Sequence, residues 1–268
     1  MEGRTIISVY NRYLDRGGED EVFESEAQLL SDHGWNVKLV TERIRFPHGL
    51  TEKIALAFNA VWSRRWHRRF HALLKQSKPH IVHVHNTFPA ISPSIYYACR
   101  QANVPVVQTL HNYRLLCPAA FFFRDGKVCE ECVDHSLWRG VRYGCYHHSR
   151  SETATVALML AVHRWARTWT EMVDWYIALT EFARQKFIAG GLPAERISVK
   201  PNFVYPDPGL GDQDREYALF VGRLSDYKGL KTLLAAWHCL RSRIPLVIVG
   251  DGPLRGELEA EATRGGLS

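Results

Sequence analysis

The sequence lacks any apolar stretch long enough to cross a lipid bilayer. Its longest uninterrupted apolar run is seven residues, 156–162, whereas a membrane-spanning helix needs about 20. The first residues, MEGRTIISVYNRY, also lack an apolar region of the length found in secretory signals. We therefore expect a protein of the cytoplasm.

The composition excludes several other classes of protein. Hydrophobic residues make up 46% and charged residues 23% of the chain, which excludes a disordered tail, a fibre and a coiled coil. At about 150 residues per domain, the length of 268 residues indicates between one and two domains.

Acidic residues are absent from a long central stretch. No Asp or Glu occurs between Glu52 and Asp125, an interval that contains ten Lys and Arg residues. The net charge of +6 is therefore concentrated in one part of the chain. Such a region attracts the phosphates of nucleotides, nucleic acids or anionic lipids. The alternative is a solvated basic surface with no partner.

Short β-rich runs alternate with helical patterns, which implies parallel strands and a doubly wound α/β sheet. Strands are expected at 5–10, 36–41, 80–85, 105–110, 175–179, 197–200, 217–221 and 245–249. Helices are expected at 19–33, 51–76, 92–102, 152–173, 181–189, 228–241 and 254–264.

The proline- and glycine-rich segment 205–214 divides this pattern and is typical of a linker. We predict a Rossmann-like N-terminal domain over 1–204, with a cysteine-rich insert at 115–150. Residues 215–268 are predicted to form an incomplete second Rossmann-like domain, which is marginal alone. We therefore expect that this part docks on the first domain or that the chain is cut short.

Glycines follow the first expected strand, where open α/β sheets bind ligands. Gly17 and Gly18 would let the backbone approach a phosphate at the start of the next helix. Their spacing is not that of a dinucleotide-binding fingerprint. The acidic residues 19–21 would repel a phosphate unless their side chains point away. A plain turn is the alternative.

Two histidine–asparagine pairs end strands of the same sheet. His85 and Asn86 end the third strand, and His111 and Asn112 end the fourth. A histidine at a strand end can bind a sugar hydroxyl or move a proton. His83 shares a strand face with His85, and we interpret His83 as a structural, hydrogen-bonded residue.

Two cations flank a strand-to-helix turn in the second unit. Arg223 follows the strand and Lys228 opens the next helix. A guanidinium fork and an ammonium at such a turn could hold a diphosphate. A tight turn, 250–253, ends the following strand.

Four of the six cysteines lie in the insert, at spacings typical of metal ligands. Eleven, two and twelve residues separate Cys117, Cys129, Cys132 and Cys145. Four thiolates can close a tetrahedron around a structural zinc ion. An iron–sulfur cluster and four reduced cysteines without metal are the alternatives. Other candidate ligands nearby are His135, His147 and His148.

The helix expected around 61–75 combines aromatic and basic residues. Trp62, Trp66 and Phe70 recur every four residues, with arginines around them. This pattern is typical of a helix that lies on a membrane surface. The alternative is an aromatic face packed on the sheet.

Several stretches together resemble the family 4 glycosyltransferases, which have the GT-B fold of two facing Rossmann-like domains. The matching stretches, which cover nearly the whole chain in the order of the family, are GGEDEVFESEAQLLSDHGWNV, PHIVHVHNTFPAISPS, TLHNYRLLCP, ALTEFARQKFIAGGLPAERISVKPNFV, VGRLSDYKGL and VIVGDGP.

The resemblance implies transfer of a sugar from a nucleotide sugar to a glycan or lipid-linked acceptor, with retention of configuration and no catalytic metal or other cofactor. It assigns Gly17, Gly18, Arg223 and Lys228 to donor binding and His111 to the transferred sugar. The acceptor would approach the residues His85, Asn86 and Asn112. The glutamate usual before the lysine is Tyr227 here.

Family members continue beyond the position of Ser268 with a glutamate pair, so the resemblance implies a truncated enzyme. Three other functions stay open: a non-catalytic partner, a nucleic-acid-binding zinc protein and a nucleotide-sugar epimerase. The absence of a recognised nucleic-acid motif disfavours the second of these, and the arginine–lysine turn favours a transferase over an epimerase.

Overall fold

The computed structural model describes residues 3–12, 16–43, 49–209, 211, 216–240 and 244–265. The chain forms two compact units. The first comprises Met1–Phe122 and Cys129–Pro208, and the second comprises Phe123–Val128 and Gly209–Ser268. Within the linker expected at 205–214, residues 210 and 212–214 lie outside the described residues, and the others form no helix or strand.

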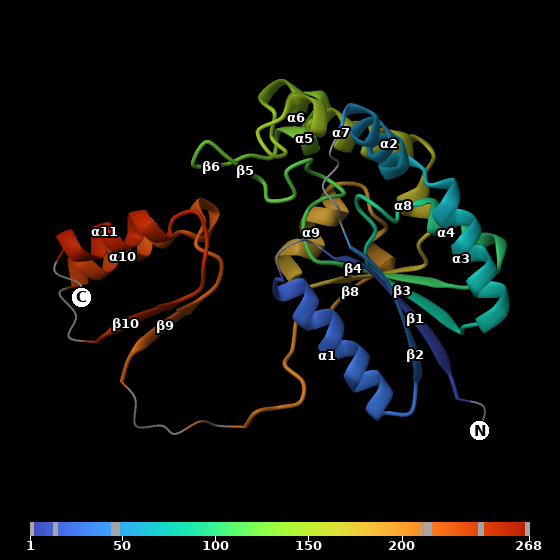
Figure 1. The fold of residues 1–268 in the computed structure, drawn as a ribbon, viewed down its shortest axis with the longest axis horizontal. Helices are drawn as coiled ribbons and strands as arrows, with labels where there is room; N and C mark the ends of the chain where they lie inside the picture. The colour runs from blue at the N-terminus through green and yellow to red at the C-terminus, as the bar shows by residue number, and fades with distance from the viewer. Residues whose placement is uncertain are drawn as a thin grey trace. The chain divides into compact units, whose positions relative to one another are not determined.

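The first unit is built on one sheet of six parallel strands, in the order β2-β1-β3-β4-β7-β8 (Figure 1). The strands are β1 (Thr5–Arg12), β2 (Asn36–Arg43), β3 (Ile81–Asn86), β4 (Val106–Leu110), β7 (Trp175–Ala178) and β8 (Ile197–Val199). This architecture confirms the predicted α/β class with a parallel sheet.

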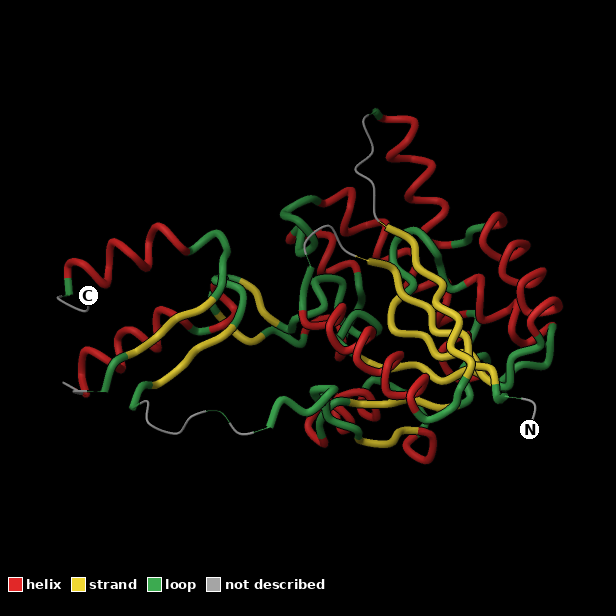
Figure 2. The backbone as a smooth tube through the Cα atoms, turned by 60° about the horizontal axis from the view of Figure 1, so that its bottom comes forward, coloured by secondary structure: helices red, strands yellow, loops and turns green. Residues whose placement is uncertain are grey.

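Helices pack on both faces of this sheet (Figure 2). They are α1 (Gly18–Asp32), α2 (Leu50–Val61), α3 (Arg64–Ser77), α4 (Ser94–Gln101), α7 (Arg150–Trp165), α8 (Thr168–Glu171) and α9 (Glu181–Ala189), followed by a 3₁₀ turn (Ala194–Arg196). Because both faces are covered, the first seven residues of β1 are all buried.

Two helices that the sequence predicts as continuous are each divided. The single helix expected over 51–76 is wrong, because α2 ends at Val61 and α3 begins at Arg64. Ser63 starts the second helix, since its hydroxyl accepts a hydrogen bond from the Trp66 amide. The helix expected over 152–173 is also wrong, because it is divided at Arg167, whose backbone is left-handed with φ of 54°.

The cysteine-rich insert contains only short elements. These are β5 (Phe123–Arg124), β6 (Lys127–Val128), α5 (Glu131–Asp134) and α6 (Trp138–Tyr143). In the part of the chain that the structure describes, no helix has the length and apolarity that crossing a bilayer requires.

The second unit contains the parallel pair β9 (Ala218–Val221) and β10 (Leu246–Val249). A 3₁₀ turn (Asp226–Lys228), α10 (Leu230–Leu240) and α11 (Arg255–Arg264) complete the pattern. Its buried core consists of leucines: Leu224, Leu230, Leu234, Leu254 and Leu258.

The strand order of the first unit identifies where a ligand would bind. It reverses at β1, which lies between β2 and β3, and open α/β sheets bind ligands beyond the carboxyl ends at such a point. Gly17 follows β1, Asn86 is the last residue of β3 and His111 follows β4, so all three lie toward the carboxyl edge. The candidate site therefore begins at this carboxyl edge.

Candidate active site

The N-terminus of α1 opens onto unoccupied space at the carboxyl edge. Gly17 precedes the helix in an extended conformation, and its amide donates to Asp20 Oδ2 over 3.0 Å. A Cβ atom added at Gly17 or Gly18 would meet no atom of the described residues within 4 Å. The backbone here is therefore accessible to an anion, which a helix N-terminus attracts.

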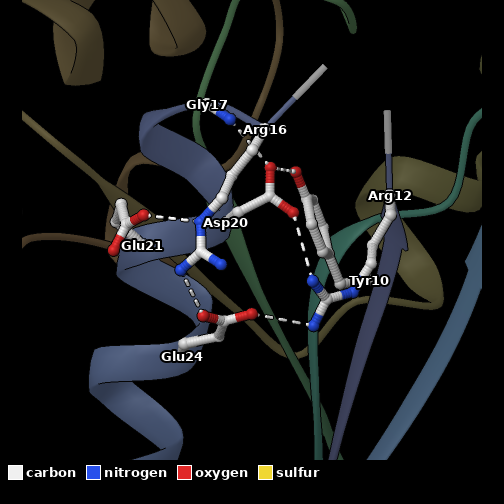
Figure 3. Close-up of polar contacts among 7 residues, drawn as sticks. All are labelled: Tyr10, Arg12, Arg16, Gly17, Asp20, Glu21 and Glu24. Atoms are coloured by element: carbon white, nitrogen blue, oxygen red, sulfur yellow. Dashed lines mark hydrogen bonds and ion pairs between the residues drawn. The ribbon is translucent and has the colours of Figure 1, made fainter. Parts of the chain in front are cut away.

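Two of the acidic residues in the first turn of α1, Asp20 and Glu21, are paired with arginines (Figure 3). Asp20 Oδ1 lies 3.6 Å from an Arg12 nitrogen, and Glu21 accepts a 2.7 Å hydrogen bond from Arg16. Glu24 accepts hydrogen bonds from both arginines. These ion pairs offset the charge of Asp20 and Glu21, whereas Glu19 has no ion pair among the described residues and its Oε2 is buried without a hydrogen-bond partner there.

The two strand-end asparagines hold the loops that follow them. Asn86 Oδ1 accepts a hydrogen bond from the Phe88 amide. Asn112 donates from Nδ2 to Glu19 Oε1 over 3.0 Å and accepts from the Arg114 amide. Burial raises the pKa of Glu19. Both asparagines thus shape the carboxyl edge by fixing its backbone.

A cluster of histidines lies beneath this edge. His85 Nδ1 and His111 Nε2 are 2.9 Å apart and share a hydrogen bond. His83 Nε2 bonds to the Thr109 hydroxyl, which agrees with its structural interpretation. His83 and His85 are buried, whereas His111 is only partly buried. His111 is therefore the member best placed to meet a ligand.

Two charged residues that the sequence analysis did not select complete the cluster. Glu26 Oε2 of α1 lies 3.5 Å from His85 Nε2 and 3.7 Å from His83 Nδ1. Lys200 Nζ, just after β8, lies 2.5 Å from Glu26 Oε1. Glu26 could have been selected from the sequence only because it is an acidic residue among the apolar positions of the first helix. No local pattern marks Lys200.

The histidines of the cluster are uncharged at neutral pH. Burial is the main cause that lowers the pKa of His83, His85 and His111, in the last case to about 4. Each ring therefore carries one proton, with one nitrogen donating and the other accepting.

The described residues contain one set of three ligand atoms close enough for a metal ion, from Glu26, His83 and His85. The Lys200 ammonium already neutralises this carboxylate. A cation here would be repelled by that ammonium.

In the second unit, Arg223 and Lys228 are exposed on either side of the turn that follows β9. Between them lies the Ser225 hydroxyl, which is buried and has no hydrogen-bond partner among the described residues. Two cations and a hydroxyl donor make a turn that can bind an anionic group.

Glycines of the next loop allow that turn to pack closely. Gly250 has φ of +150°, and a Cβ there would lie 1.9 Å from the Gly222 carbonyl oxygen. Gly252 has φ of +159°, and its Cβ would lie 2.4 Å from the Leu224 oxygen. Only glycine fits at these positions, so the loop after β10 fixes the backbone on which Arg223 lies.

The four insert cysteines lie in the first unit and are reduced. Cys117 and Cys132 are buried, and Cys129 and Cys145 are half-buried. All three others raise the pKa of Cys132 electrostatically, although burial is the main cause, so the four thiols are near one another. Their sulfur atoms do not form a set of three within 4.8 Å.

The aromatic face of α3 is not exposed, so its interpretation as a membrane-binding face is wrong. Trp66, Phe70 and Leu74 are buried in the core. The exposed apolar residues lie instead on the preceding helix, where Leu50 is 74% and Phe58 72% exposed.

Family models match almost the whole chain. The model for Glycosyltransferase Family 4 matches residues 16–207, and the model for Glycosyl transferases group 1 matches residues 206–268. A curated relative, O-antigen chain mannosyltransferase C of Escherichia coli, is 54% identical over 52 residues, which are 19% of this chain and 14% of that protein.

Solved structures share the fold. The apo form of the lipopolysaccharide outer core galactosyltransferase WaaB is 16% identical, with a TM-score of 0.50 over 98% of this chain and 65% of its own. Anabaena HepE in complex with UDP and glucose is 18% identical, with a TM-score of 0.51 over 99% of this chain and 67% of its own. The chain thus spans about two thirds of the length of these structures and a small part of the curated relative.

Proposed function

Because this chain belongs to glycosyltransferase family 4, we propose that it transfers a sugar from a nucleotide-sugar donor to a glycan or lipid-linked acceptor in the cytoplasm. We further propose that the anomeric configuration is retained and that no metal takes part in the reaction. The observation that carries this proposal is the contact of two strand ends with each other, between His85 and His111, and with the first turn of α1, between Asn112 and Glu19. The UDP and UDP-glucose complexes of HepE support a nucleotide-sugar donor.

The proposal gives the candidate residues of each unit distinct roles. Arg223 and Lys228 bind the diphosphate, and the amides near Gly17 and Gly18 bind negative charge close to the sugar. His111 contacts the transferred sugar. His85, Asn86 and Asn112 border the acceptor, with the asparagines acting through the loops that they fix.

The proposed chemistry depends on electrostatic stabilisation. Breaking the bond between sugar and phosphate leaves negative charge on the diphosphate. Arg223 and Lys228 of the second unit are proposed to stabilise this charge as it develops, which is worth about 10²- to 10³-fold in rate for each well-placed donor. A diphosphate is a good leaving group, so positioning and charge supply most of the acceleration.

A turnover assay tests the proposal. Purified protein is incubated with UDP-glucose, UDP-galactose, UDP-N-acetylglucosamine and GDP-mannose, and release of the nucleoside diphosphate is measured. We expect release from one of these sugars above the rate without protein, since water can replace a missing acceptor. Failure of all four donors, with no binding of UDP or GDP by calorimetry, would reject a nucleotide-sugar enzyme.

A lipid-linked acceptor would bring the protein to the inner face of a membrane, and the surface of α2 fits such a contact. Leu50, Ile54 and Phe58 recur every four residues and are all exposed. Exposed arginines begin the next helix at Arg64 and Arg65. Apolar residues beside arginines complement an anionic lipid surface.

We propose a structural zinc ion as the organiser of the insert, held by the thiolates of the four cysteines, whose sulfur atoms would have to move closer together to bind it. The insert has only short strands and helices to hold its backbone, and a tetrahedral metal would join its distant parts. The Gly140 amide hydrogen-bonds to Cys132, as amides do to metal-bound thiolates. Zinc would deprotonate Cys132, whose pKa burial raises to about 11.

Metal analysis tests this site. Protein purified without chelator is expected to hold about one zinc per chain. The variant Cys132→Ser should lose it, whereas Cys239→Ser, at an exposed cysteine outside the insert, should retain it. Wild-type protein without zinc, or a Cys132→Ser variant with full zinc content, would contradict the proposal.

A further inference from the structure

A chain of polar contacts connects α1 to the histidine at the carboxyl edge. Lys200 Nζ lies 2.5 Å from Glu26 Oε1, and Glu26 Oε2 lies 3.5 Å from His85 Nε2. The other nitrogen of His85 is 2.9 Å from His111 Nε2. Four side chains from separate parts of the first unit therefore form one continuous path that ends at His111.

Two atoms in this path lack a hydrogen bond and face each other. Glu26 Oε2 and His85 Nε2 are both buried, and neither has a hydrogen-bond partner among the described residues. A carboxylate can only accept, and the other oxygen of Glu26 is paired with the Lys200 ammonium at 2.5 Å. A proton on His85 Nε2 satisfies both atoms. If His85 Nε2 had no proton, its lone pair would face the oxygen of the Glu26 carboxylate.

A proton on His85 Nε2 determines which of the remaining nitrogens of His85 and His111 carry protons. Burial lowers the pKa of His85, so the ring has a single proton and its Nδ1 is an acceptor. The 2.9 Å bond to His111 therefore requires His111 Nε2 to donate. His111 is neutral as well, because burial lowers its pKa to about 4. Its Nδ1 is left without a proton.

We propose that Glu26 is a positioning residue that acts through His85 to hold His111 in the tautomer protonated at Nε2. His111 then presents an acceptor nitrogen, Nδ1, to the site. This inference rests on the proposed function, in which His111 contacts the donor sugar. It follows that the protein prefers a donor whose hexose has a hydroxyl that donates to His111. The analogue that lacks this hydroxyl should be used less well.

The neighbouring His83 is compatible with the same arrangement. Its Nδ1 lies 3.7 Å from Glu26 Oε2, and its Nε2 is bonded to the Thr109 hydroxyl. A proton on Nδ1 faces the carboxylate, and the threonine then donates to Nε2. Glu26 thus lies next to possible donors on two histidines, at 3.5 and 3.7 Å, and next to the Lys200 ammonium, at 2.5 Å.

Nitrogen-15 NMR identifies the tautomer of His111 and does not require the protein to be catalytically active. Histidine is labelled in the full chain, long-range nitrogen–proton correlations are recorded at neutral pH, and the His111 signals are assigned from their loss in His111→Gln. We expect His111 with Nε2 protonated and Nδ1 unprotonated. The opposite pattern in wild-type protein would overturn the proposal, and this measurement depends on no variant of Glu26.

In the variant Glu26→Gln, the donors and acceptors of the contacts between residue 26, His85 and His111 are expected to exchange roles. Lys200 donates to the amide oxygen, so the amide NH₂ takes the place of Oε2 and donates to His85 Nε2. His85 then donates from Nδ1, and His111 becomes protonated at Nδ1. Sugar turnover should fall about 10- to 100-fold, because a donor would replace the acceptor that meets the sugar hydroxyl. UDP binding should stay unchanged.

The matched control is Asp32→Asn, which removes a carboxylate from the exposed end of the same helix. It should alter neither the tautomer nor turnover. A folded Glu26→Gln protein with an unchanged His111 tautomer, or with a reversed tautomer and full turnover, would overturn the positioning role. If the proposed function fails instead, the wild-type tautomer stays as expected while no nucleotide sugar is consumed.

Discussion

The double variant Arg223→Ala/Lys228→Ala is expected to lose nucleotide-sugar turnover by a factor of about 10³ or more. Removal of one well-placed donor to a developing charge costs about 10²- to 10³-fold, or about 3–4 kcal/mol. Both side chains are exposed in the second unit and are absent from its leucine core. The loss should therefore come from the diphosphate and not from unfolding. Nucleoside diphosphate release at saturating and limiting donor measures it.

The matched control for this variant is Arg255→Ala. Arg255 is an exposed cation of the same unit that pairs with Glu259 along α11. Its removal should leave kcat/KM within about twofold, since an exposed pair contributes little. Turnover of the double variant equal to that of this control would show that Arg223 and Lys228 do not bind the diphosphate.

The triple variant Leu50→Gln/Ile54→Gln/Phe58→Gln is expected to lose binding to anionic vesicles by a factor of about 10² or more. The three side chains form one exposed stripe on α2, and inserting each into a membrane surface contributes about 1–2 kcal/mol. Folding should be retained, because the stripe lies outside the core. Co-sedimentation with phosphatidylserine-containing vesicles at low salt measures the change.

The control for membrane binding is Phe182→Gln on α9, where an aromatic residue is 64% exposed. This variant should bind vesicles like the wild type. Added salt should weaken wild-type binding, because the arginines of α3 contribute through screened charge. The membrane proposal would be contradicted if wild-type protein did not bind at low salt, or if the triple variant bound equally well.

The strands could be predicted because each is a short run rich in β-branched and aromatic residues between turn-forming residues, whereas their order in the sheet was not predicted. The division between α2 and α3 could not be predicted. Ser63 starts α3 through its own cap, and buried contacts with Ser92 and Ser94, far along the chain, hold it in place. The helical spacing of apolar residues, every 3.6 positions, continues across such a break. The spacing therefore does not reveal where one helix ends and the next begins.

The residues of the candidate site likewise include some that the sequence could reveal and some that it could not. His85 and His111 could be selected because the end of a strand fixes which edge of a parallel sheet its next residue occupies. Lys200 could not, since 174 positions separate it from Glu26 and only the packing of α1 brings the two together. The exposure of the α3 aromatics was also unpredictable, because a stripe of apolar residues looks the same whether a sheet or a lipid covers it.

The most direct test of the account compares wild-type protein with His111→Ala in the nucleotide-sugar assay, with UDP or GDP binding measured in parallel. The account predicts that the wild type consumes one nucleotide sugar and that His111→Ala loses about 10²-fold or more in kcat. Its affinity for the nucleoside diphosphate should be retained, because His111 meets the sugar. Equal turnover by the two proteins would contradict the placement of the reaction at the carboxyl edge of the sheet.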